Sequence, residues 1–390
     1  MLNEKGLGHR MPVAPLKLAV LDSFKEMGKR INQYIVDFRQ DYQYPDPTIR
    51  PEESYLIGAH CPRFGTGESK GEIDGSVRGV DLYIIADVCN HSMTYTINGM
   101  VNHMSPDNHF QDIKRIIAAA NGKAHRVNVI MPFLYESRQH TRELRESLDA
   151  AMGLQELISM GVTNIITFDA HDPRVQNAIP IDGFESFSAY YQFMKAIFRC
   201  VDDLKVDPNH LMIISPDEGA MGRAVYLANI LGVDMGMFYK RRDYTRLVNG
   251  RNPIIAHEFL GDDLKDKDVI VIDDMISSGD SMLDVCRQLK ERGAARVIIC
   301  CTFGLFTNGL AAFDEYYEKG LMHRLITTNL VYQDPELLKR PYYKTADMAK
   351  YLAMIIDNLN HAKPLSEVID PSEKIHALLR KQTVENMMHI

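Results

Sequence analysis

Two adjacent carboxylates, Asp273 and Asp274, stand between an apolar run and a turn of small residues. The run Val269–Ile272 has the composition of a buried parallel strand, and a helix is expected to open near Ser281. Ligands of open α/β sheets bind beyond the carboxyl ends of strands, and backbone N–H groups at a helix start can hold a phosphate. The predicted phosphate ligands are the five turn residues Ser277, Ser278, Gly279, Asp280 and Ser281.

The paired aspartates would then face either sugar hydroxyls or a metal. A strand–turn–helix unit with a polar corner is the alternative that involves no ligand. Burying two neighbouring carboxylates without a partner is costly, which favours a binding site for a sugar phosphate.

Cationic and acidic groups follow two further predicted strands in this half of the chain. Asp217 comes shortly after the apolar run Leu211–Ile214, and Lys240 and Arg242 follow the run Met235–Phe238. A triphosphate carries a charge of about −4, so phosphoryl transfer requires cations and usually Mg²⁺. Lys240 and Arg242 are candidates for that work, and a solvated charge run is the alternative.

In the first half of the chain, polar residues also follow the C-terminal ends of predicted strands. Arg138 and Gln139 follow a predicted strand and are donors suited to phosphate or adenine, although a solvated loop has the same composition. Asp169 and His171 follow the next predicted strand and are candidate ligands of Mg²⁺, or partners of its ligands. A structural histidine is the alternative for His171.

The strands that position these polar residues alternate with helices in each half of the chain. The pattern predicts an α/β protein with two doubly wound parallel-sheet domains and an active site between them. The expected parts are an extension over 1–15, an ATP-side domain over 16–185 completed by about 340–360, a sugar-phosphate domain over 186–339, and a polar helical tail over 361–390.

Composition narrows the class of protein. The 390 residues carry a net charge of −8, which disfavours a nucleic-acid-binding surface. There is no run of 18 apolar residues and no apolar segment near the N-terminus, so neither a membrane span nor a signal peptide is expected. The six cysteines form no CxxC pair and are expected to be reduced thiols of a cytoplasmic protein.

Between about Leu16 and Leu359 the chain resembles the ribose-phosphate pyrophosphokinase (phosphoribosyl pyrophosphate synthetase) family. The stretch around Asp273 resembles the loop that this family shares with type I phosphoribosyltransferases. The resemblance implies that both parallel-sheet domains are of phosphoribosyltransferase type. The other motifs that carry the resemblance are Phe64–Glu68, Val77–Gly79, Arg138–Gln139, Thr167–His171, Ser215–Asp217 and Lys240–Arg242. A phosphoribosyltransferase is expected to lack the motifs of the first half, so their presence favours the pyrophosphokinase.

The resemblance implies a Mg²⁺-dependent transfer of the β,γ-pyrophosphoryl group of ATP to the 1-hydroxyl of ribose 5-phosphate, for nucleotide biosynthesis. It implies that Phe64 and Glu68 reach ATP in a neighbouring subunit and that Arg138 and Gln139 bind ATP. His171 would contact Mg²⁺-ATP. The family forms homo-oligomers built from dimers, up to hexamers.

On the sugar side, the resemblance places Asp217 near the ribose and Asp273 and Asp274 on its 2- and 3-hydroxyls. The turn from Ser277 to Ser281 would hold the 5-phosphate. Lys240 and Arg242 would stabilise the transition state.

Several positions depart from the family pattern, among them Thr66, His140 and Asp280. Asp280 is the most awkward, because a carboxylate beside a dianionic phosphate costs about 1 kcal/mol when solvent screens it. Either Asp280 points away and favours the helix N-terminus, or the acceptor carries a phosphodiester, as ADP-ribose does. A non-catalytic regulatory paralogue of the enzyme is a further alternative.

Overall fold

The computed structural model describes residues 11–40, 42, 44, 46, 50–242 and 254–388, and for 240–242, 254–257, 367 and 383–388 it describes the backbone alone. The chain forms two compact units. Unit 1 comprises residues 1–188, 330–332 and 347–370, and unit 2 comprises 189–329, 333–346 and 371–390. The domain limits expected from the sequence stay a prediction.

Unit 1 is built on a parallel sheet of six strands in the order β10-β9-β8-β5-β1-β2. Its central strand β5 is buried along its whole length, as expected for a sheet covered on both faces. The strands are β1 (Leu16–Val20), β2 (Leu56–Ile57), β5 (Asp81–Ile85), β8 (Arg126–Ile130), β9 (Asn164–Phe168) and β10 (Gly183–Phe187). Two antiparallel pairs lie outside this sheet, β3 (Ala59–His60) with β4 (Glu72–Ile73) and β6 (Thr94–Ile97) with β7 (Met100–His103).

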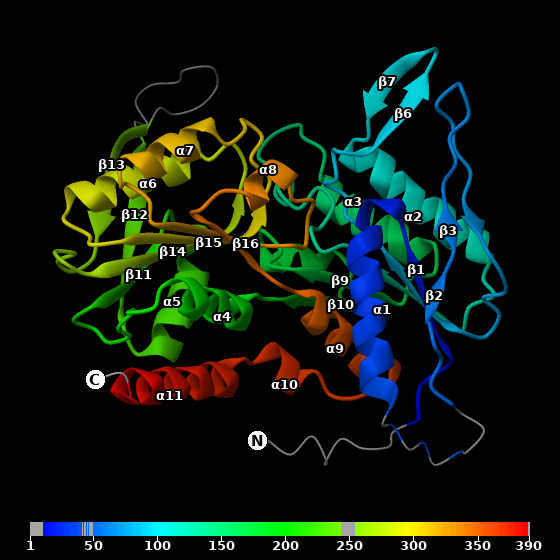
Figure 1. Cartoon of the computed structure of the whole chain (residues 1–390). Coiled ribbons are helices and arrows are strands. Elements are labelled where there is room, and N and C mark those ends of the chain that lie inside the picture. Colours follow the sequence, from blue (N-terminus) through cyan, green and yellow to red (C-terminus); the bar gives the residue numbers. More distant parts are fainter. Residues whose placement is uncertain are drawn as a thin grey trace. The chain divides into compact units, whose positions relative to one another are not determined.

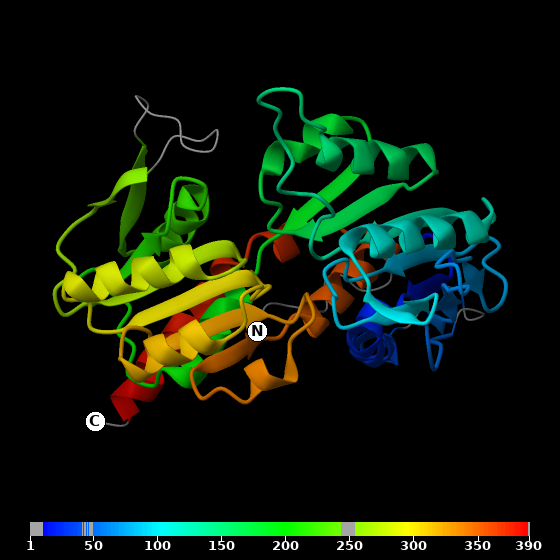
Figure 2. The same ribbon diagram turned by 90° about the horizontal axis from the view of Figure 1, so that it is seen from above.

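Helices cover both faces of the unit 1 sheet (Figures 1 and 2). The helices of this unit are α1 (Lys25–Gln40), α2 (Pro106–Ala120), α3 (Asp149–Ser159), α9 (Ala349–Asn360) and α10 (Ser366–Ile369). α2 and α3 lie on one face, and α1 and α9 pack together on the other. The α1–α9 contact includes a buried ion pair in which Arg39 Nε donates to Asp357 Oδ1 at 2.7 Å.

Unit 2 is built on a sheet of seven strands in the order β13-β12-β11-β14-β15-β16-β17. All neighbouring strands are parallel except β12 and β13. The strands are β11 (Leu211–Ser215), β12 (Asp234–Arg242), β13 (Ile254–Leu260), β14 (Asp268–Ile276), β15 (Val297–Gly304), β16 (Arg324–Thr328) and β17 (Tyr343–Ala346).

The helices of unit 2 also lie on both faces of their sheet, with α4 and α5 on one and α6 and α7 on the other (Figure 1). Their bounds are α4 (Tyr190–Cys200), α5 (Met221–Leu231), α6 (Asp280–Glu291), α7 (Ala311–Glu318), α8 (Pro335–Leu338) and α11 (Ser372–Met388). α6 turns its apolar face, including Leu283, Cys286 and Leu289, into a core shared with β14 and β15.

The predicted fold class, doubly wound parallel sheets of α/β type, is confirmed. Several elements differ from the expectation. β14 continues through Ile276, so the paired aspartates lie within the strand rather than after it. The β6–β7 hairpin and the edge strands β10, β13 and β17 were not expected.

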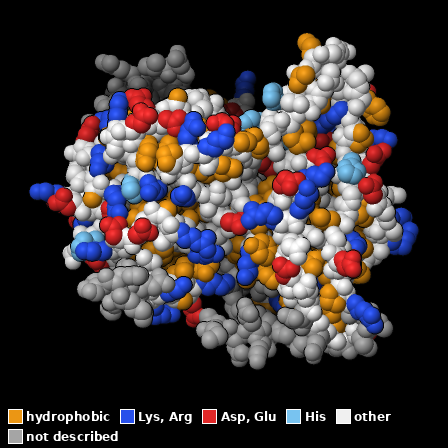
Figure 3. Space-filling model, in the orientation of Figure 1, with side chains coloured by type: hydrophobic (Ala, Val, Ile, Leu, Met, Phe, Trp, Pro, Cys, Tyr) orange, Lys and Arg blue, Asp and Glu red, His pale blue; other side chains and the backbone are white. Residues whose placement is uncertain are grey.

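Charged side chains of both signs are interspersed with apolar ones on the face of the molecule that Figure 3 shows. No helix in the described part of the chain combines the length and the hydropathy that crossing a membrane requires.

Candidate active site

The paired aspartates lie in the C-terminal half of β14, the central strand of unit 2. Asp273 pairs in register with Cys301 of β15, and the backbone N–H of Asp274 donates to Asp273 Oδ1 at 2.8 Å. Asp274 is buried and Asp273 is half-buried. The paired, largely buried strand fixes the backbone at both residues.

Asp273 has neighbours that disfavour its ionised form. Burial and the carboxylates of Asp274 and Asp217 raise the pKa of Asp273 well above its usual value. The carboxylate of Asp217 is close enough to affect Asp273. The structure therefore brings together three acids that were all predicted to lie at the ribose. Crowded acids of this kind are typical of sites that bind hydroxyls or cations.

Asp217 belongs to the turn between β11 and α5. Its Oδ1 accepts from the backbone N–H groups of Gly219 at 3.0 Å and Ala220 at 3.3 Å. These bonds fix the orientation of the carboxylate at the end of the strand next to β14.

A cation that the sequence reasoning missed lies beside this acidic cluster. Arg223 Nη2 is 3.7 Å from Asp274 Oδ2, and both side chains are largely buried. Buried carboxylates need such a partner, since an uncompensated buried charge is strongly destabilising. The signal was present in the sequence, because Arg223 closes the same polar segment as Asp217.

The turn after β14 leads directly into α6. Gly279 has φ +97°, in the left-handed region, and a Cβ built on it would lie 2.4 Å from the ring of Phe313. Only glycine fits both conditions. The first backbone N–H groups of the 12-residue helix α6 follow at once, where a helix has unsatisfied donors and a positive dipole end.

Asp280 is the first residue of α6 and is exposed. Its Oδ2 accepts from the Ser278 hydroxyl at 3.0 Å. A carboxylate in the first helical turn interacts favourably with the dipole, which is the first of the two explanations considered for this residue.

In unit 1 the predicted ATP-binding pair follows β8. Arg138 is exposed, whereas the Gln139 side chain donates to the carbonyls of Thr141 at 3.1 Å and Ser147 at 2.9 Å. Gln139 therefore holds the loop that leads to α3. The Arg138 guanidinium is accessible to a solution ligand.

Asp169 and His171 follow β9, the neighbour of β8 in the sheet. Asp169 has φ +34°, and its Oδ1 accepts from the Ser188 hydroxyl at 3.0 Å. His171 is exposed and its ring centroid lies 5.4 Å from that of His140. The exits of β8 and β9 thus bring His140 and His171 together.

His140 is a second residue that sequence reasoning did not place in the site. Its Nε2 is 3.4 Å from Asp172 Oδ2, and its Nδ1 lies 3.2 Å from the carbonyl of Ser137. Hydrogen bonds from the Arg174 guanidinium lower the pKa of Asp172 to about 2, so this carboxylate is charged beside His140 at neutral pH. The signal available in the sequence was the departure at His140 itself.

Among the described residues, no group of three or more His, Cys, Asp and Glu side chains is arranged to hold a metal ion. Mg²⁺ commonly takes one or two carboxylates and completes its shell with phosphate oxygens and water. Asp169 offers one carboxylate of that kind, so the residues fit a metal that arrives with a triphosphate.

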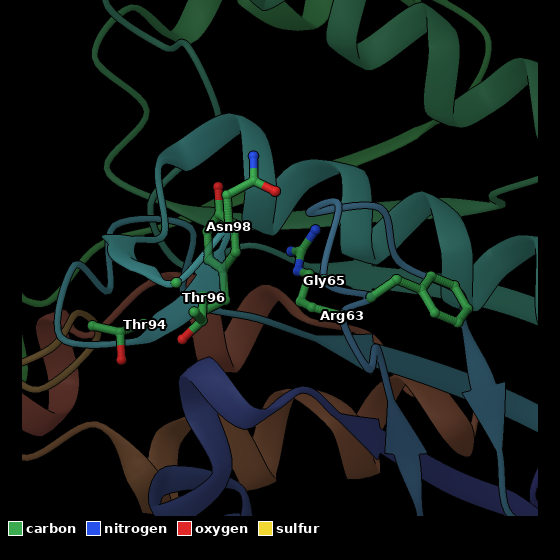
Figure 4. A pocket seen from close by; sticks show the side chains of 8 residues that line it. Arg63, Gly65, Thr94, Thr96 and Asn98 are labelled. Atoms are coloured by element: carbon green, nitrogen blue, oxygen red, sulfur yellow. The ribbon is translucent and has the colours of Figure 1, made fainter.

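Phe64 and Glu68 belong to another part of unit 1, the loop between β3 and β4. Phe64 is 52% exposed, and the loop closes on itself through a bond from the Phe64 N–H to the Glu68 carbonyl at 2.8 Å. A pocket of about 540 Å³ lies between this loop and the β6–β7 hairpin (Figure 4). Its lining residues are Arg63, Phe64, Gly65, Thr94, Tyr95, Thr96, Asn98 and Gly99.

For the predicted catalytic cations Lys240 and Arg242, the structure describes the backbone alone. The backbone of Lys240 and Arg242 lies in β12, paired with His257 and Ile254 of β13. Their side chains lie outside what the structure describes. Their predicted role stays a prediction, as do the other site assignments.

Two family models match separate parts of this chain. Residues 16–161 match the N-terminal domain of ribose phosphate pyrophosphokinase, and residues 188–339 match the phosphoribosyl transferase domain. A ribose-phosphate pyrophosphokinase A of Dictyostelium discoideum is 26% identical over 318 residues, which cover 81% of this chain and 90% of the relative. A ribose-phosphate pyrophosphokinase of Wolinella succinogenes is 27% identical over 316 residues, with 80% and 91% covered.

A solved structure shows the same fold. The phosphoribosylpyrophosphate synthetase of Mycobacterium smegmatis superposes with a TM-score of 0.67 at 21% identity, covering 88% of this chain and 98% of its own. Two family domains in this order, with relatives matched over nine-tenths of their length, identify the chain as a member of the ribose-phosphate pyrophosphokinase family of enzymes.

Proposed function

We propose that this enzyme transfers the β,γ-pyrophosphoryl group of ATP to the 1-hydroxyl of ribose 5-phosphate, giving 5-phosphoribosyl 1-pyrophosphate and AMP for nucleotide biosynthesis. The observation that carries the proposal is the acid pair Asp273 and Asp274 next to the turn that opens α6. Carboxylates accept hydrogen bonds from vicinal hydroxyls, while N–H groups at a helix start bind phosphate. One ligand with both groups is a sugar phosphate.

On the acceptor side, Asp273 and Asp274 hold the 2- and 3-hydroxyls, and Arg223 limits the repulsion within the pair. The 5-phosphate is held by Ser277, Ser278, Gly279 and Ser281. The 1-hydroxyl attacks the β-phosphorus in line, the bond to the α-phosphate breaks, and AMP leaves. The chain contributes position and charge, with no covalent intermediate.

On the donor side, Arg138 binds the nucleotide from the exit of β8, and the loop with Phe64 and Glu68 reaches the nucleotide of a neighbouring subunit. Mg²⁺, bound with ATP, supplies positive charge to the transferred group. Asp169 would offer the metal an oxygen ligand, and His171 would contact the Mg²⁺-ATP complex. Lys240 and Arg242 neutralise charge that develops on the transferred group.

The test is AMP release by the purified chain with ATP, Mg²⁺ and ribose 5-phosphate. Lys240→Ala is the control, because loss of one transition-state cation costs about 10²-fold or more in kcat. Lysine-dependent AMP with ribose 5-phosphate supports the proposal. AMP release with ADP-ribose alone would move the activity to a larger acceptor, and no lysine-dependent AMP with either sugar would leave a regulatory paralogue.

A homo-oligomer built from dimers and a cytoplasmic location are part of the same proposal. Sedimentation of the purified chain with and without ATP tests the first.

A further inference from the structure

We propose that the β6–β7 hairpin sets the affinity of the enzyme for ATP by holding the Phe64–Glu68 loop in its binding conformation. The inference rests on the proposed function, because it assumes that this loop binds the nucleotide. The hairpin residues Tyr95 and Ile97 are positioning residues here: they act through the loop, and the proposal gives them no contact with the reacting atoms.

Hydrogen bonds within the Phe64–Glu68 loop close it on itself, but most of its side chains are exposed. A bond from the Gly67 N–H to the Phe64 carbonyl at 2.8 Å closes a tight turn, and Thr66 Oγ1 donates to Glu68 Oε2 at 2.9 Å. Phe64, Gly65, Thr66 and Glu68 are all exposed. A short exposed loop of this kind is mobile unless a neighbouring element packs against it.

The hairpin is that neighbouring element. It places Tyr95 and Ile97 on its half-buried face, while Thr94 and Thr96 alternate with them on the exposed face. At its tip, Asn98 and Gly99 have φ +49° and +80°, as the tight two-residue turns of hairpins require. This turn fixes the register of the two strands, so Tyr95 and Ile97 lie together on the half-buried face.

Three contacts join the two segments. The Asn98 N–H donates to the Gly65 carbonyl at 3.3 Å, and a Cβ built on Gly67 would lie 2.7 Å from Ile97 Cδ1. The guanidinium carbon of Arg63 lies 5.1 Å from the centroid of the Tyr95 ring. Figure 4 shows Arg63 and Gly65 on one side of the shared pocket and Thr94, Thr96 and Asn98 on the other.

Arg63 connects this contact to the core of unit 1. Its Nη2 donates to Asp112 Oδ2 at 2.8 Å. Asp112 lies in α2 and also accepts from Arg115 of the same helix at 2.6 Å. The Arg63 side chain is largely buried. The base of the loop is thus clamped between α2 and the hairpin, and removing the Tyr95 ring would loosen one side of the clamp.

The experiment compares Tyr95→Ala and Tyr95→Phe with the wild-type chain. An interaction of a cation with an aromatic ring of this kind corresponds to roughly a three- to tenfold effect on affinity. Tyr95→Ala should raise the KM for ATP and the Kd for ATP in calorimetry by that factor, with kcat at saturating ATP and the KM for ribose 5-phosphate unchanged. Tyr95→Phe keeps the ring and should behave as wild type.

Val101→Ala is the matched control, because Val101 lies on the same hairpin but is 69% exposed. It should leave every constant unchanged. An unaltered ATP affinity in Tyr95→Ala overturns the proposal. So does a parallel fall of kcat and of both affinities with lost thermal stability, which would mark Tyr95 as merely structural.

The direct binding measurement keeps this test separate from that of the reaction. If the wild-type chain binds ATP but releases no AMP, the proposed function fails, while a weaker Kd in Tyr95→Ala still supports the hairpin's role. If the wild-type chain does not bind ATP, the hairpin proposal fails as well.

Discussion

Asp273 illustrates a conflict between stability and binding at the scale of one residue. Burial, Asp274 and Asp217 raise its pKa, so folding favours the protonated form. A group with a raised folded pKa contributes stability that is fully present below its unfolded pKa, near 4, and is lost as the pH rises through the folded value. The ligand-free enzyme should therefore lose stability from this site as the pH rises above about 4.

Asp273→Asn should remove that loss. We expect the variant to melt at a higher temperature than the wild type at pH 7 to 8, with a smaller difference near pH 4, and to lose AMP release. Asp262→Asn, at an exposed position, is the control and should change neither. Parallel pH–stability curves for the wild type and Asp273→Asn would contradict the argument.

The Asp280 carboxylate lies in the turn that is proposed to bind the 5-phosphate, and its negative charge would repel that phosphate. Asp280→Asn retains the size of the side chain and an acceptor for Ser278, but removes the negative charge. We expect the KM for ribose 5-phosphate to fall by about fivefold, corresponding to the roughly 1 kcal/mol of screened repulsion. Helix stability should decrease by less than about 1 kcal/mol. The KM for ATP is the internal control, and an unchanged KM for the sugar would show that the carboxylate does not face the phosphate.

At the scale of elements, the turn between β14 and α6 depends on one glycine. Gly279→Ala meets both a positive φ and the Phe313 ring. Gly309 is a matched control, because it also has a positive φ, +77°, but a Cβ there would meet nothing within 4 Å. Gly309→Ala should cost about 1 kcal/mol in unfolding free energy, and Gly279→Ala should cost more by about 1–3 kcal/mol of overpacking.

Denaturant unfolding of the two variants checks the difference. Gly279→Ala should also raise the KM for ribose 5-phosphate, which Gly309→Ala should not. Equal costs at both sites would mean that α7 moves aside and that the Phe313 contact does not constrain the turn.

The elements that could be predicted from the sequence are those with strong apolar runs. The runs over 82–86, 127–132, 163–168, 211–214 and 296–302 predict strands, and β5, β8, β9, β11 and β15 lie within a few residues of them. Edge strands such as β13 and β17 alternate or are short, so their apolar runs are weak. The strand β14 was expected to end at Ile272, because two adjacent aspartates are typical of the end of a strand. The burial of Asp274 next to Arg223 is a tertiary effect, which the local sequence pattern does not contain.

The β6–β7 hairpin could have been predicted. Asn98-Gly99 between alternating residues is the strongest short-range signal for a hairpin. Its neighbour in space, the Phe64–Glu68 loop, is some thirty residues earlier in the chain. Contacts over that distance, like the meeting of His140 with His171, depend on how loops fold back and are not contained in spacing alone.

For the whole molecule, the important feature is that unit 1 is discontinuous. Arg39 of α1 and Asp357 of α9 are both 3% exposed and belong to the same unit, although unit 2 lies between them in the sequence. Burial alone would raise the pKa of Asp357, but His361 and Arg39 together hold it well below its usual value. A depressed pKa contributes stability that is present above the unfolded pKa, near 4, and is lost as the pH falls below it.

Asp357→Asn should therefore destabilise unit 1 by about 3 kcal/mol or more at pH 7, since it leaves a buried arginine uncompensated. It should also flatten the loss of stability in acid. Asp347→Asn is the control, because its ion pair with Arg30 also joins the two ends of unit 1 but is exposed, and should cost under about 1 kcal/mol. Thermal melts of both variants between pH 3 and pH 7 check this, and similar melting temperatures would contradict it.

The same ion pair has a consequence for synthesis of the chain. When residue 188 leaves the ribosome, α1 has been made but the helix that covers it has not. At 5–20 residues per second, roughly ten to thirty seconds pass before α9 follows. During that interval the nascent chain exposes the apolar face of α1, with Arg39 lacking its carboxylate, while unit 2 is already emerging. Chaperones that hold unfinished chains should therefore engage α1, and release should coincide with the arrival of Asp357.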